Sequence, residues 1–220
     1  MKETKPLPEE IALPLSNQHQ RYLALFDFDG TITDRDSMLA FLRYSHSATG
    51  FIIKSILCTP VLCAFALNII SNEKAKELIL KRFFQDWNEA KLTEIGQQFS
   101  TNELDSLVRK LAIKRILAHL TAGHDVVVVS ASLTSWLQPW CENNNLDIIA
   151  TLPKFSDTDK FIGINGKNCY GNEKAIRICE RYTLKNYTSI YAYGDSAGDN
   201  EMLNLAHIKH FKPFRSSYLL

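Results

Sequence analysis

An apolar run that ends in two carboxylates constrains this chain more than any other feature of its sequence. The stretch YLALFDFDGTITDRDS begins at Tyr22, and its acids Asp27 and Asp29 are followed at once by Gly30 and two threonines. The run is short and rich in aromatic and branched residues, which predicts a buried strand. Its apolar continuity favours a parallel strand with both faces covered.

The two acids would lie at the carboxyl end of that strand. Ligands of open parallel sheets bind outside the carboxyl ends of the strands, which makes Asp27 and Asp29 candidates for a binding or catalytic site. Aspartate is also a common turn residue after a strand, and this pair alone does not separate the two interpretations.

Helix and strand patterns alternate after residue 100. A helix is expected over 101–123, with Thr101 or Asn102 as its N-cap and Gly123 at its end. The later patterns are strands in 124–132, 146–152 and 207–212, helices in 133–145 and 171–184, a hairpin in 154–164, and a strand that runs into a loop and a helix in 189–206. This βαβ series predicts an α/β fold, a Rossmann-like parallel sheet with helices on both faces.

Residues 37–100 break the alternation, because only helical patterns occur there. We expect an all-helical cap inserted after the first strand. The expected organisation is a loose tail over 1–20, an α/β catalytic core over 21–36 and 101–220, and the helical cap over 37–100.

The composition indicates a packed globular protein. Hydrophobic residues make up 45% of the 220 residues and charged residues 22%, so a sizeable core is expected. The net charge of +1 offers no basic excess for binding nucleic acid. The five cysteines are scattered without metal-binding spacing, which favours reduced thiols and a cytoplasmic location. Residues 1–20 lack the apolar core of a secretory signal.

Polar side chains also follow other expected strands, at the same edge of the sheet. Ser130 ends the second strand, Asp195 ends the fourth with Asp199 four residues later, and Lys174 opens a helix. With the first two acids, these side chains place four carboxylates in one cleft, which repel one another unless a cation lies among them. Oxygen ligands without His or Cys suit Mg²⁺.

This set has the parts needed for phosphoryl transfer. The hydroxyl of Ser130 and the ammonium of Lys174 suit a phosphate, which commonly shares Mg²⁺ with one or two carboxylates. Asp27 could attack phosphorus to give an aspartyl-phosphate. Asp29 could protonate the leaving oxygen and later take a proton from water, while the metal and Lys174 offset charge on the phosphoryl oxygens.

Four short motifs resemble those of the haloacid-dehalogenase superfamily and occur in the same order. DFDGTITD resembles the first motif, D-x-D-x-T, VVVVSAS the second, GNEK the third and GDSAGDNEML the fourth. The resemblance implies that Asp27 is the nucleophile and a metal ligand, and that Asp29 is the general acid/base and gives a backbone carbonyl to Mg²⁺. It implies that Asp195 is the third protein ligand of the metal. It also implies supporting positions for Thr33, in the first-motif turn, and for Asp199, near the metal waters or Lys174.

The position of the helical insertion resembles the phosphoserine-phosphatase branch of that superfamily. The motif sequences look most like the group that contains bacterial phosphatidylglycerophosphate phosphatase. Asp36 stands where phosphoserine phosphatases have a Glu that meets the substrate amine, Gly30 where Ser is usual, and Gly198 where Asn is common. These departures argue against phosphoserine as the substrate. Asp36 is expected either to contact the substrate or to cap the first cap helix.

Residues 51–70 form a long apolar stretch with Lys54 as its single charge. Its length could span a bilayer, but a single span would separate Asp27 from the later site residues, and Pro60 adds a kink. Two compatible interpretations remain. We favour a buried pair of cap helices over an apolar cap surface that makes peripheral contact with a membrane.

The sequence therefore predicts Mg²⁺-dependent hydrolysis of a phosphomonoester through an aspartyl-phosphate. The expected substrate is a lipid or other membrane-associated phosphate, or else a small soluble phosphate or a phosphorylated protein side chain such as phosphotyrosine. A non-catalytic module that binds a phosphate ligand is the alternative from another class, and the presence of every chemical group disfavours it.

Overall fold

The computed structural model describes residues 13–17 and 19–215. Within them, six strands form one sheet in the order β4-β3-β2-β1-β5-β6. Their bounds are β1 Tyr22–Phe26, β2 Asp125–Leu133, β3 Asp147–Phe155, β4 Phe161–Asn165, β5 Ser189–Gly194 and β6 Ile208–Phe211. All neighbouring pairs are parallel except β3 and β4, which form the predicted hairpin.

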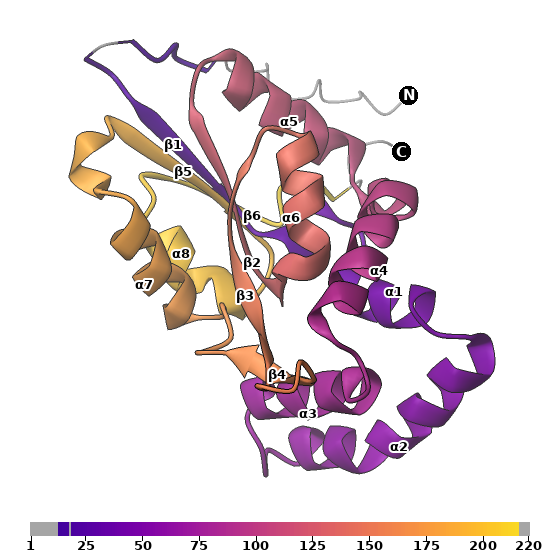
Figure 1. The fold of residues 1–220 in the computed structure, drawn as a ribbon. Coiled ribbons are helices and arrows are strands. Elements are labelled where there is room, and N and C mark those ends of the chain that lie inside the picture. Colours follow the sequence, from indigo (N-terminus) through magenta and orange to yellow (C-terminus); the bar gives the residue numbers. More distant parts are fainter. Residues whose placement is uncertain (1–12, 18, 216–220) are drawn as a thin grey trace, which may run out of the picture.

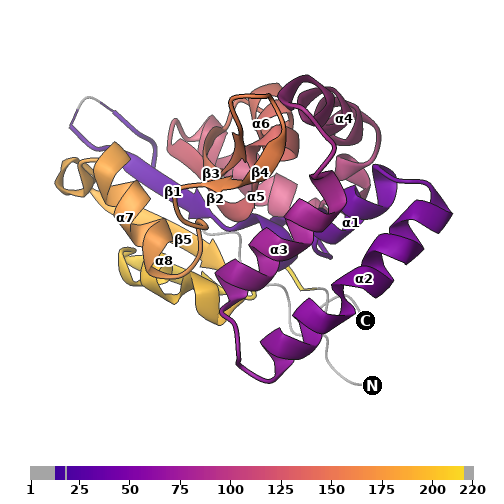
Figure 2. The ribbon, with the colours of Figure 1, turned by 60° about the horizontal axis from the view of Figure 1, so that its bottom comes forward.

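Helices cover both faces of this sheet. On one face lie α5 (Lys110–Thr121) and α6 (Thr134–Asn143), and on the other lie α7 (Asn172–Arg181) and α8 (Asn200–Asn204), as Figures 1 and 2 show. The predicted fold class, a mostly parallel α/β sheet with a helical insertion after the first strand, is confirmed.

Alternate residues of the central strand enter two separate cores. Phe26 of β1 packs in a cluster with Trp136 of α6, whereas Leu25 packs in a second cluster with Ile178 of α7. None of these four side chains has exposed surface. Because side chains alternate across a strand, an apolar run such as YLALF can fill both cores at once. Burial of each such side chain contributes about 1.5–3 kcal/mol.

The segment between β1 and β2 is helical, as predicted. Its helices are α1 (Ser37–Tyr44), α2 (Ala48–Ala66), α3 (Asn72–Phe84) and α4 (Glu89–Asn102). α4 packs against α6, where a Cβ added to Gly96 would lie only 2.0 Å from the carbonyl oxygen of Ser135. The helices that project from the sheet layers are therefore α2 and α3, which pack together (Figure 1).

The helix predicted over 101–123 begins later than expected. Thr101 and Asn102 lie in the last turn of α4, a short 3-10 turn covers Leu104–Leu107, and α5 starts only at Lys110. Val108 is extended and forms a bridge with Thr33 of the first-motif turn, and this tertiary pairing interrupts the helix. The predicted N-caps are wrong for that reason.

The stretch before β1 is partly held by the core. The amide of Ser16 donates to the carbonyl of Ala122 at 2.8 Å, and Nε2 of His124 lies 2.7 Å from the carbonyl oxygen of Pro14. Of the tail predicted over 1–20, residues 1–12 and 18 lie outside the described residues.

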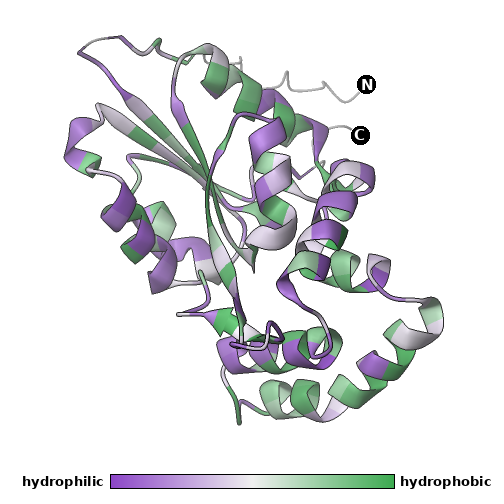
Figure 3. Cartoon of the chain, viewed as in Figure 1, coloured by the Kyte–Doolittle hydropathy of each residue, from purple (hydrophilic) through white to green (hydrophobic). Residues whose placement is uncertain are grey.

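The favoured interpretation of residues 51–70 as a buried pair of helices is wrong. A single helix, α2, runs to Ala66, and of its residues only Cys58 is buried. Large apolar side chains are exposed along it, among them Ile52, Ile53, Ile56, Leu57 and Leu62. Figure 3 shows α2 as a mainly hydrophobic helix at the edge of the molecule. By length and composition it is the one helix among the described residues that could cross a membrane.

Candidate active site

Asp27 lies directly beyond the carboxyl end of the central strand β1. Its amide donates to the carbonyl of Tyr193 on β5 at 2.9 Å, which extends the parallel pairing by one residue. The chain then leaves the sheet through the turn Phe28–Ile32, in which Gly30 has a φ of +84°. The left-handed backbone at that position favours glycine.

Asp29 is held by donors on both of its carboxylate oxygens. Oδ1 accepts from the amide of Ser37 at 2.6 Å, at the start of α1. Oδ2 accepts from the hydroxyl of Ser132 at 2.7 Å and lies 3.5 Å from the hydroxyl of Ser130. These contacts fix the orientation of the carboxyl group between the cap and β2.

Lys174 lies between two buried carboxylates. Its ammonium is 2.5 Å from Oδ1 of Asp27 and 2.6 Å from Oδ1 of Asp199, and its side chain is only 2% exposed. The lysine comes from the first turn of α7, where a positive charge opposes the helix dipole. The two carboxylates offset that cost, so the ion pairs account for a lysine at this position.

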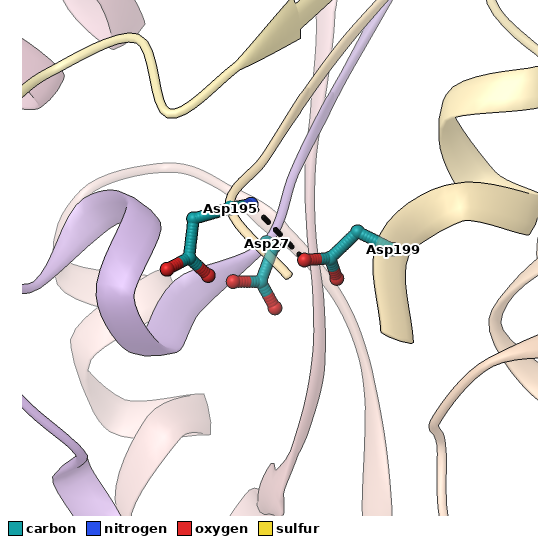
Figure 4. A group of neighbouring side chains, drawn as sticks. All are labelled: Asp27, Asp195 and Asp199. Atoms are coloured by element: carbon teal, nitrogen blue, oxygen red, sulfur yellow. Dashed lines mark hydrogen bonds between the residues drawn. The ribbon is translucent and has the colours of Figure 1, made fainter. Parts of the chain in front are cut away.

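The other carboxylate oxygen of Asp199 accepts hydrogen bonds from the loop that follows β5. Oδ2 accepts from the amides of Asp195 and Ser196 at 3.1 and 3.0 Å and from the hydroxyl of Ser196 at 2.9 Å. Both oxygens of Asp199 are therefore occupied by protein donors. Asp199 orients Lys174 and the Asp195 backbone, and Asp195 directs its own carboxylate toward Asp27 (Figure 4).

The pKa values follow from burial and from this charge pattern. Burial raises the pKa of Asp27 to about 7, although the charge of Lys174 opposes the shift. Burial disfavours the charged form of Lys174, yet Asp27 and Asp199 hold its pKa above the ordinary value. Burial would also raise the pKa of Asp199, but Lys174 and Ser196 bring it below the usual range. Lys174 and Asp199 are therefore charged at neutral pH.

Oxygen atoms of Asp27, Asp195 and Asp199 lie within 4.8 Å of one another. Carboxylate oxygens without His or Cys are the donors that Mg²⁺ prefers. A Cβ added to Gly30 would lie 2.6 Å from Oδ2 of Asp195, so only glycine leaves that carboxylate its place. Oδ2 of Asp195 also accepts from the guanidinium of Arg215 at 2.7 Å. The donor set fits a divalent cation between Asp27 and Asp195.

The remaining sequence-predicted residues lie around this centre. Ser130 is fully buried, and its hydroxyl accepts from the amide of Ser132 at 3.0 Å. Thr33 donates to the carbonyl of Phe28 at 3.2 Å and so closes the first-motif turn. Asp36 is the N-cap of α1, with its side chain accepting from the amide of Leu39 at 2.7 Å, and it also lines the site cavity.

A cavity of about 420 Å³ opens over these residues. Five aspartates and two lysines line it together with apolar side chains from the cap: Asp27, Asp29, Asp36, Asp195 and Asp199, Lys76 and Lys174, and Met38, Leu62, Phe65, Ala75 and Ile79. The cavity therefore has a charged floor and an apolar wall supplied by α1, α2 and α3.

Several polar residues of the cavity were missed by sequence reasoning, among them Ser132, Lys76 and Asn168. Ser132 stands two residues after Ser130, and side chains at i and i+2 share one face of a strand, so that signal was available. Lys76 shares one helix face with Ala75 and Ile79, but a lysine in a helix pattern ordinarily indicates a solvated surface. Asn168 lies in a loop and carries no local signal.

Comparison with known proteins places the chain in a family. The model of the haloacid dehalogenase-like hydrolases matches residues 24–204. The chain belongs to the haloacid dehalogenase-like hydrolases, as the order of its motifs and the position of its acids indicate.

The chain is also similar to individual relatives and solved structures. The protein CicA of Caulobacter vibrioides is 30% identical over 199 residues, which cover 90% of this chain and 88% of CicA. A probable phosphatase of Mycobacterium tuberculosis is 28% identical over 203 residues, covering 89% of this chain and 70% of the relative. A phospho-aspartyl intermediate analogue of phosphoserine phosphatase shares the fold, with a TM-score of 0.62 at 17% identity over 86% of this chain and 85% of the other.

The family, the fold and these relatives together identify the enzyme class: the chain is a phosphatase-type hydrolase. The group of phosphatidylglycerophosphate phosphatases, which the motifs resemble, is not among the proteins compared above.

Proposed function

We propose that this protein hydrolyses phosphomonoesters with Mg²⁺ through an aspartyl-phosphate on Asp27. The observation that carries the proposal is the division of roles between two neighbouring acids. Within residues 13–17 and 19–215, one carboxylate oxygen of Asp27 has no protein donor, whereas both oxygens of Asp29 are held by donors. A nucleophile needs a free oxygen, and an acid/base group needs a fixed orientation.

The reaction has two steps. A carboxylate oxygen of Asp27 attacks phosphorus, the bond to the ester oxygen breaks, and Asp29 gives that oxygen a proton. A water molecule, losing a proton to Asp29, then attacks phosphorus, and the bond to Asp27 breaks to release phosphate. Lys174 stays beside Asp27 and offsets charge on the phosphoryl oxygens. Mg²⁺, held by Asp27, Asp195 and the backbone carbonyl of Asp29, would supply further charge stabilisation.

We propose an amphiphilic substrate, a phosphomonoester with an apolar part. The support is the composition of the cavity, whose floor is charged and whose wall includes Leu62 and Phe65 of α2 and Ile79 of α3. Small soluble phosphates and phosphorylated protein side chains are the alternative substrates. They would leave that wall in contact with water, which costs about 25 cal/mol for each Å² of apolar surface.

We further propose that α2 makes peripheral contact with a membrane that carries anionic lipids. A helix that is apolar all round is normally buried, yet α2 has one buried residue, Cys58. Its exposed surface continues through Leu62 and Phe65 into the cavity wall. Apart from Lys76, which lines the cavity, α2 and α3 together carry four basic side chains against two acidic ones, Glu73 and Glu77, and a basic surface is attracted to anionic lipid headgroups.

Phosphate release tests the catalytic proposal. The native protein should release phosphate from p-nitrophenyl phosphate and from a lipid phosphomonoester in vesicles, and chelation with EDTA should stop both. Asp27→Asn should lose at least 99% of the activity, whereas the control Asp34→Asn, at an exposed position of the same loop, should keep it. Unchanged turnover after chelation or in Asp27→Asn would reject the mechanism, whereas absence of phosphate release by the native protein would favour a module that only binds phosphate.

A further inference from the structure

Lys76 brings a second lysine to the cavity from the cap. It lies on α3, with Ala75 and Ile79 beside it on the helix face that lines the cavity. Lys174, in contrast, comes from α7 on the other side of the site. Lys76 of α3 contacts Ala131 of β2 and Asn168, which belong to the core and not to the cap. Its side chain therefore does more than keep a helix surface soluble.

The contacts of Lys76 are made with neutral oxygens. Its ammonium donates to the carbonyl of Ala131 and, at 3.2 Å, to Oδ1 of Asn168. Asn168 is itself buried, and its Oδ1 also accepts from the hydroxyl of Thr151 at 3.0 Å. Among the described residues, none of the ion pairs includes Lys76. An ammonium has three donors, and two acceptors leave the third N–H for a ligand.

The contacts of Lys76 place it on the leaving-group side of the reaction. Its ammonium binds the carbonyl of Ala131, and the next residue, Ser132, donates its hydroxyl to Oδ2 of Asp29 at 2.7 Å. Burial lowers the pKa of Lys76 to about 8, and the charges of Asp29 and Asp36 act against that shift. Asp29 is the group that we propose protonates the leaving oxygen. A cation beside Asp29 therefore faces the alcohol part of the substrate, whereas Lys174, which contacts Asp27, faces the phosphoryl group.

We propose that Lys76, oriented by Ala131 and Asn168, binds a second anionic group carried by the alcohol part of the substrate. The proposal rests on the proposed phosphomonoesterase function and narrows its substrate class. The shared chemistry is an anionic oxygen group one or more bonds beyond the ester, either a carboxylate or a phosphodiester. A partly desolvated ammonium with a spare donor binds such a group strongly, since charge-assisted hydrogen bonds are about twice as strong as neutral ones.

Binding without turnover tests this subsite. In Asp27→Asn protein with Mg²⁺, calorimetry would compare glycerol 3-phosphate with two esters that add an anion: 3-phosphoglycerate, with a carboxylate, and glycerophosphoglycerol phosphate, with a phosphodiester. At least one of the anionic esters should bind more tightly than glycerol 3-phosphate. Adding Lys76→Met should lower the affinity for that ester at least tenfold and change the affinity for glycerol 3-phosphate less than twofold. Lys76→Arg should restore the preference.

The control is Lys74→Met, which removes an exposed lysine from the same helix, one that pairs with Glu77. It should leave both affinities unchanged. Equal weakening of all three esters by Lys76→Met would overturn the proposal and would mean that Lys76 only joins α3 to the loop at Ala131. Absence of any preference in the parent protein would overturn it as well.

These outcomes are separate from the fate of the proposed function. If Asp27 is not the nucleophile, Asp27→Asn will still release phosphate, and calorimetry will still decide whether Lys76 binds the second anion. If the enzyme turns over but shows no dependence on Lys76, the mechanism stands and the subsite is rejected.

Discussion

Asp27 and Asp29 are separated by one residue and have opposite surroundings. Asp27 contacts the buried ammonium of Lys174, whereas Asp29 accepts hydrogen bonds from an amide of the cap and a hydroxyl of β2. Both acids belong to the turn that leaves β1, in which Gly30 takes a left-handed conformation and lets the carboxylate of Asp195 approach. Two identical side chains thus acquire different chemistry from position alone.

Gly30 gives a prediction at this scale. Gly30→Ala adds a methyl group 2.6 Å from Oδ2 of Asp195 at a φ of +84°, so the carboxylate has to move. The left-handed conformation should cost about 1 kcal/mol of unfolding free energy, and the displaced ligand should weaken Mg²⁺ binding. We expect the Mg²⁺ concentration for half-maximal phosphate release to rise at least tenfold.

Gly166→Ala is the matched control for that change. Gly166 has a φ of +74°, and a Cβ there would have nothing within 4 Å. The substitution should lower the free energy of unfolding in urea by the same backbone cost, with no change in Mg²⁺ dependence. If both variants need more Mg²⁺, or neither does, the approach of Gly30 to Asp195 does not shape the metal site.

Sequence reasoning brought together the residues that carry a motif and missed those that do not. Asp27, Asp29, Lys174 and Asp195 follow strands or open helices at one sheet edge, and the structure brings them to one cavity. Lys76 could not be identified in this way, because its role depends on where α3 lies relative to β2. That placement results from packing between distant segments, which local patterns do not encode.

At the scale of elements, α2 shows that a sequence pattern can predict a helix without predicting whether the helix is buried or exposed. An apolar run of this length predicts a helix, but the same run suits a buried helix and a membrane-contacting one. The structure fully buries only Cys58 of α2, because α3 covers only part of the helix. The prediction of one helix over 101–123 is wrong for a different reason. The helical spacing of apolar residues continues through Val108, but the bridge of Val108 with Thr33 interrupts the helix there.

The exposed surface of α2 gives a second prediction. Ile53→Glu with Ile56→Glu places two charges at positions that are 53% and 64% exposed and outside the cavity lining. Burying a charge in the bilayer interface is unfavourable, so binding to vesicles with anionic lipid should fall at least tenfold in a sedimentation assay. Hydrolysis of p-nitrophenyl phosphate should stay within twofold of the native rate.

The control for this pair is Leu117→Glu on α5, which is 55% exposed and far from the cap in sequence. It should leave vesicle binding unchanged. Loss of soluble turnover in the α2 variant would show that α2 serves the internal packing of the cap, and failure of the native protein to bind vesicles would remove the membrane contact altogether.

A buried chain of hydrogen bonds joins α5 to β5 and to the stretch before β1. Nε2 of His119 lies 2.8 Å from the hydroxyl of Tyr193, and its Nδ1 lies 2.8 Å from Nδ1 of His124. Nε2 of His124 in turn lies near the carbonyl oxygen of Pro14, and Arg115 donates to Tyr193. The chain is satisfied when both imidazoles are neutral, with Tyr193 and His119 donating in sequence toward Pro14.

These hydrogen bonds predict that the free energy of unfolding falls in mild acid. Burial, with the nearby charges of His124 and Arg115, lowers the pKa of His119 to about 3 from its ordinary 6.5. The unfolded state therefore binds a proton that the folded state refuses, and stability falls as pH drops below 6.5 until about 3. Between pH 7 and 5 His119 should cost about 2 kcal/mol of unfolding free energy. Urea unfolding at both pH values measures it.

His119→Gln should flatten that dependence even if it lowers stability at pH 7, because glutamine does not titrate. Exposed His19 supplies the comparison, and His19→Gln should leave the native slope in place. An unaltered slope in His119→Gln would mean that other groups cause the acid sensitivity.

At the scale of the whole molecule, the active site forms only where separate parts of the chain meet. β1 and β5 supply the acids, α7 supplies Lys174, and the inserted cap supplies Lys76 and the apolar wall. The cavity holds more acidic than basic side chains, which favours a cation in it, while the cap surface is basic and apolar. Figure 2 shows α2 and α3 together beside the sheet layers, so a substrate held at a membrane would reach the acids past these helices.

The central claim, that Asp27 accepts the phosphoryl group, is tested most directly by trapping the intermediate. Asp29→Asn should slow the hydrolysis step, and borohydride added during turnover of p-nitrophenyl phosphate should reduce an aspartyl-phosphate to homoserine. Peptide mass spectrometry should then find homoserine at position 27, only when Mg²⁺ and substrate are both present. Release of nitrophenol without homoserine at that position, or with homoserine at another aspartate, would contradict the account.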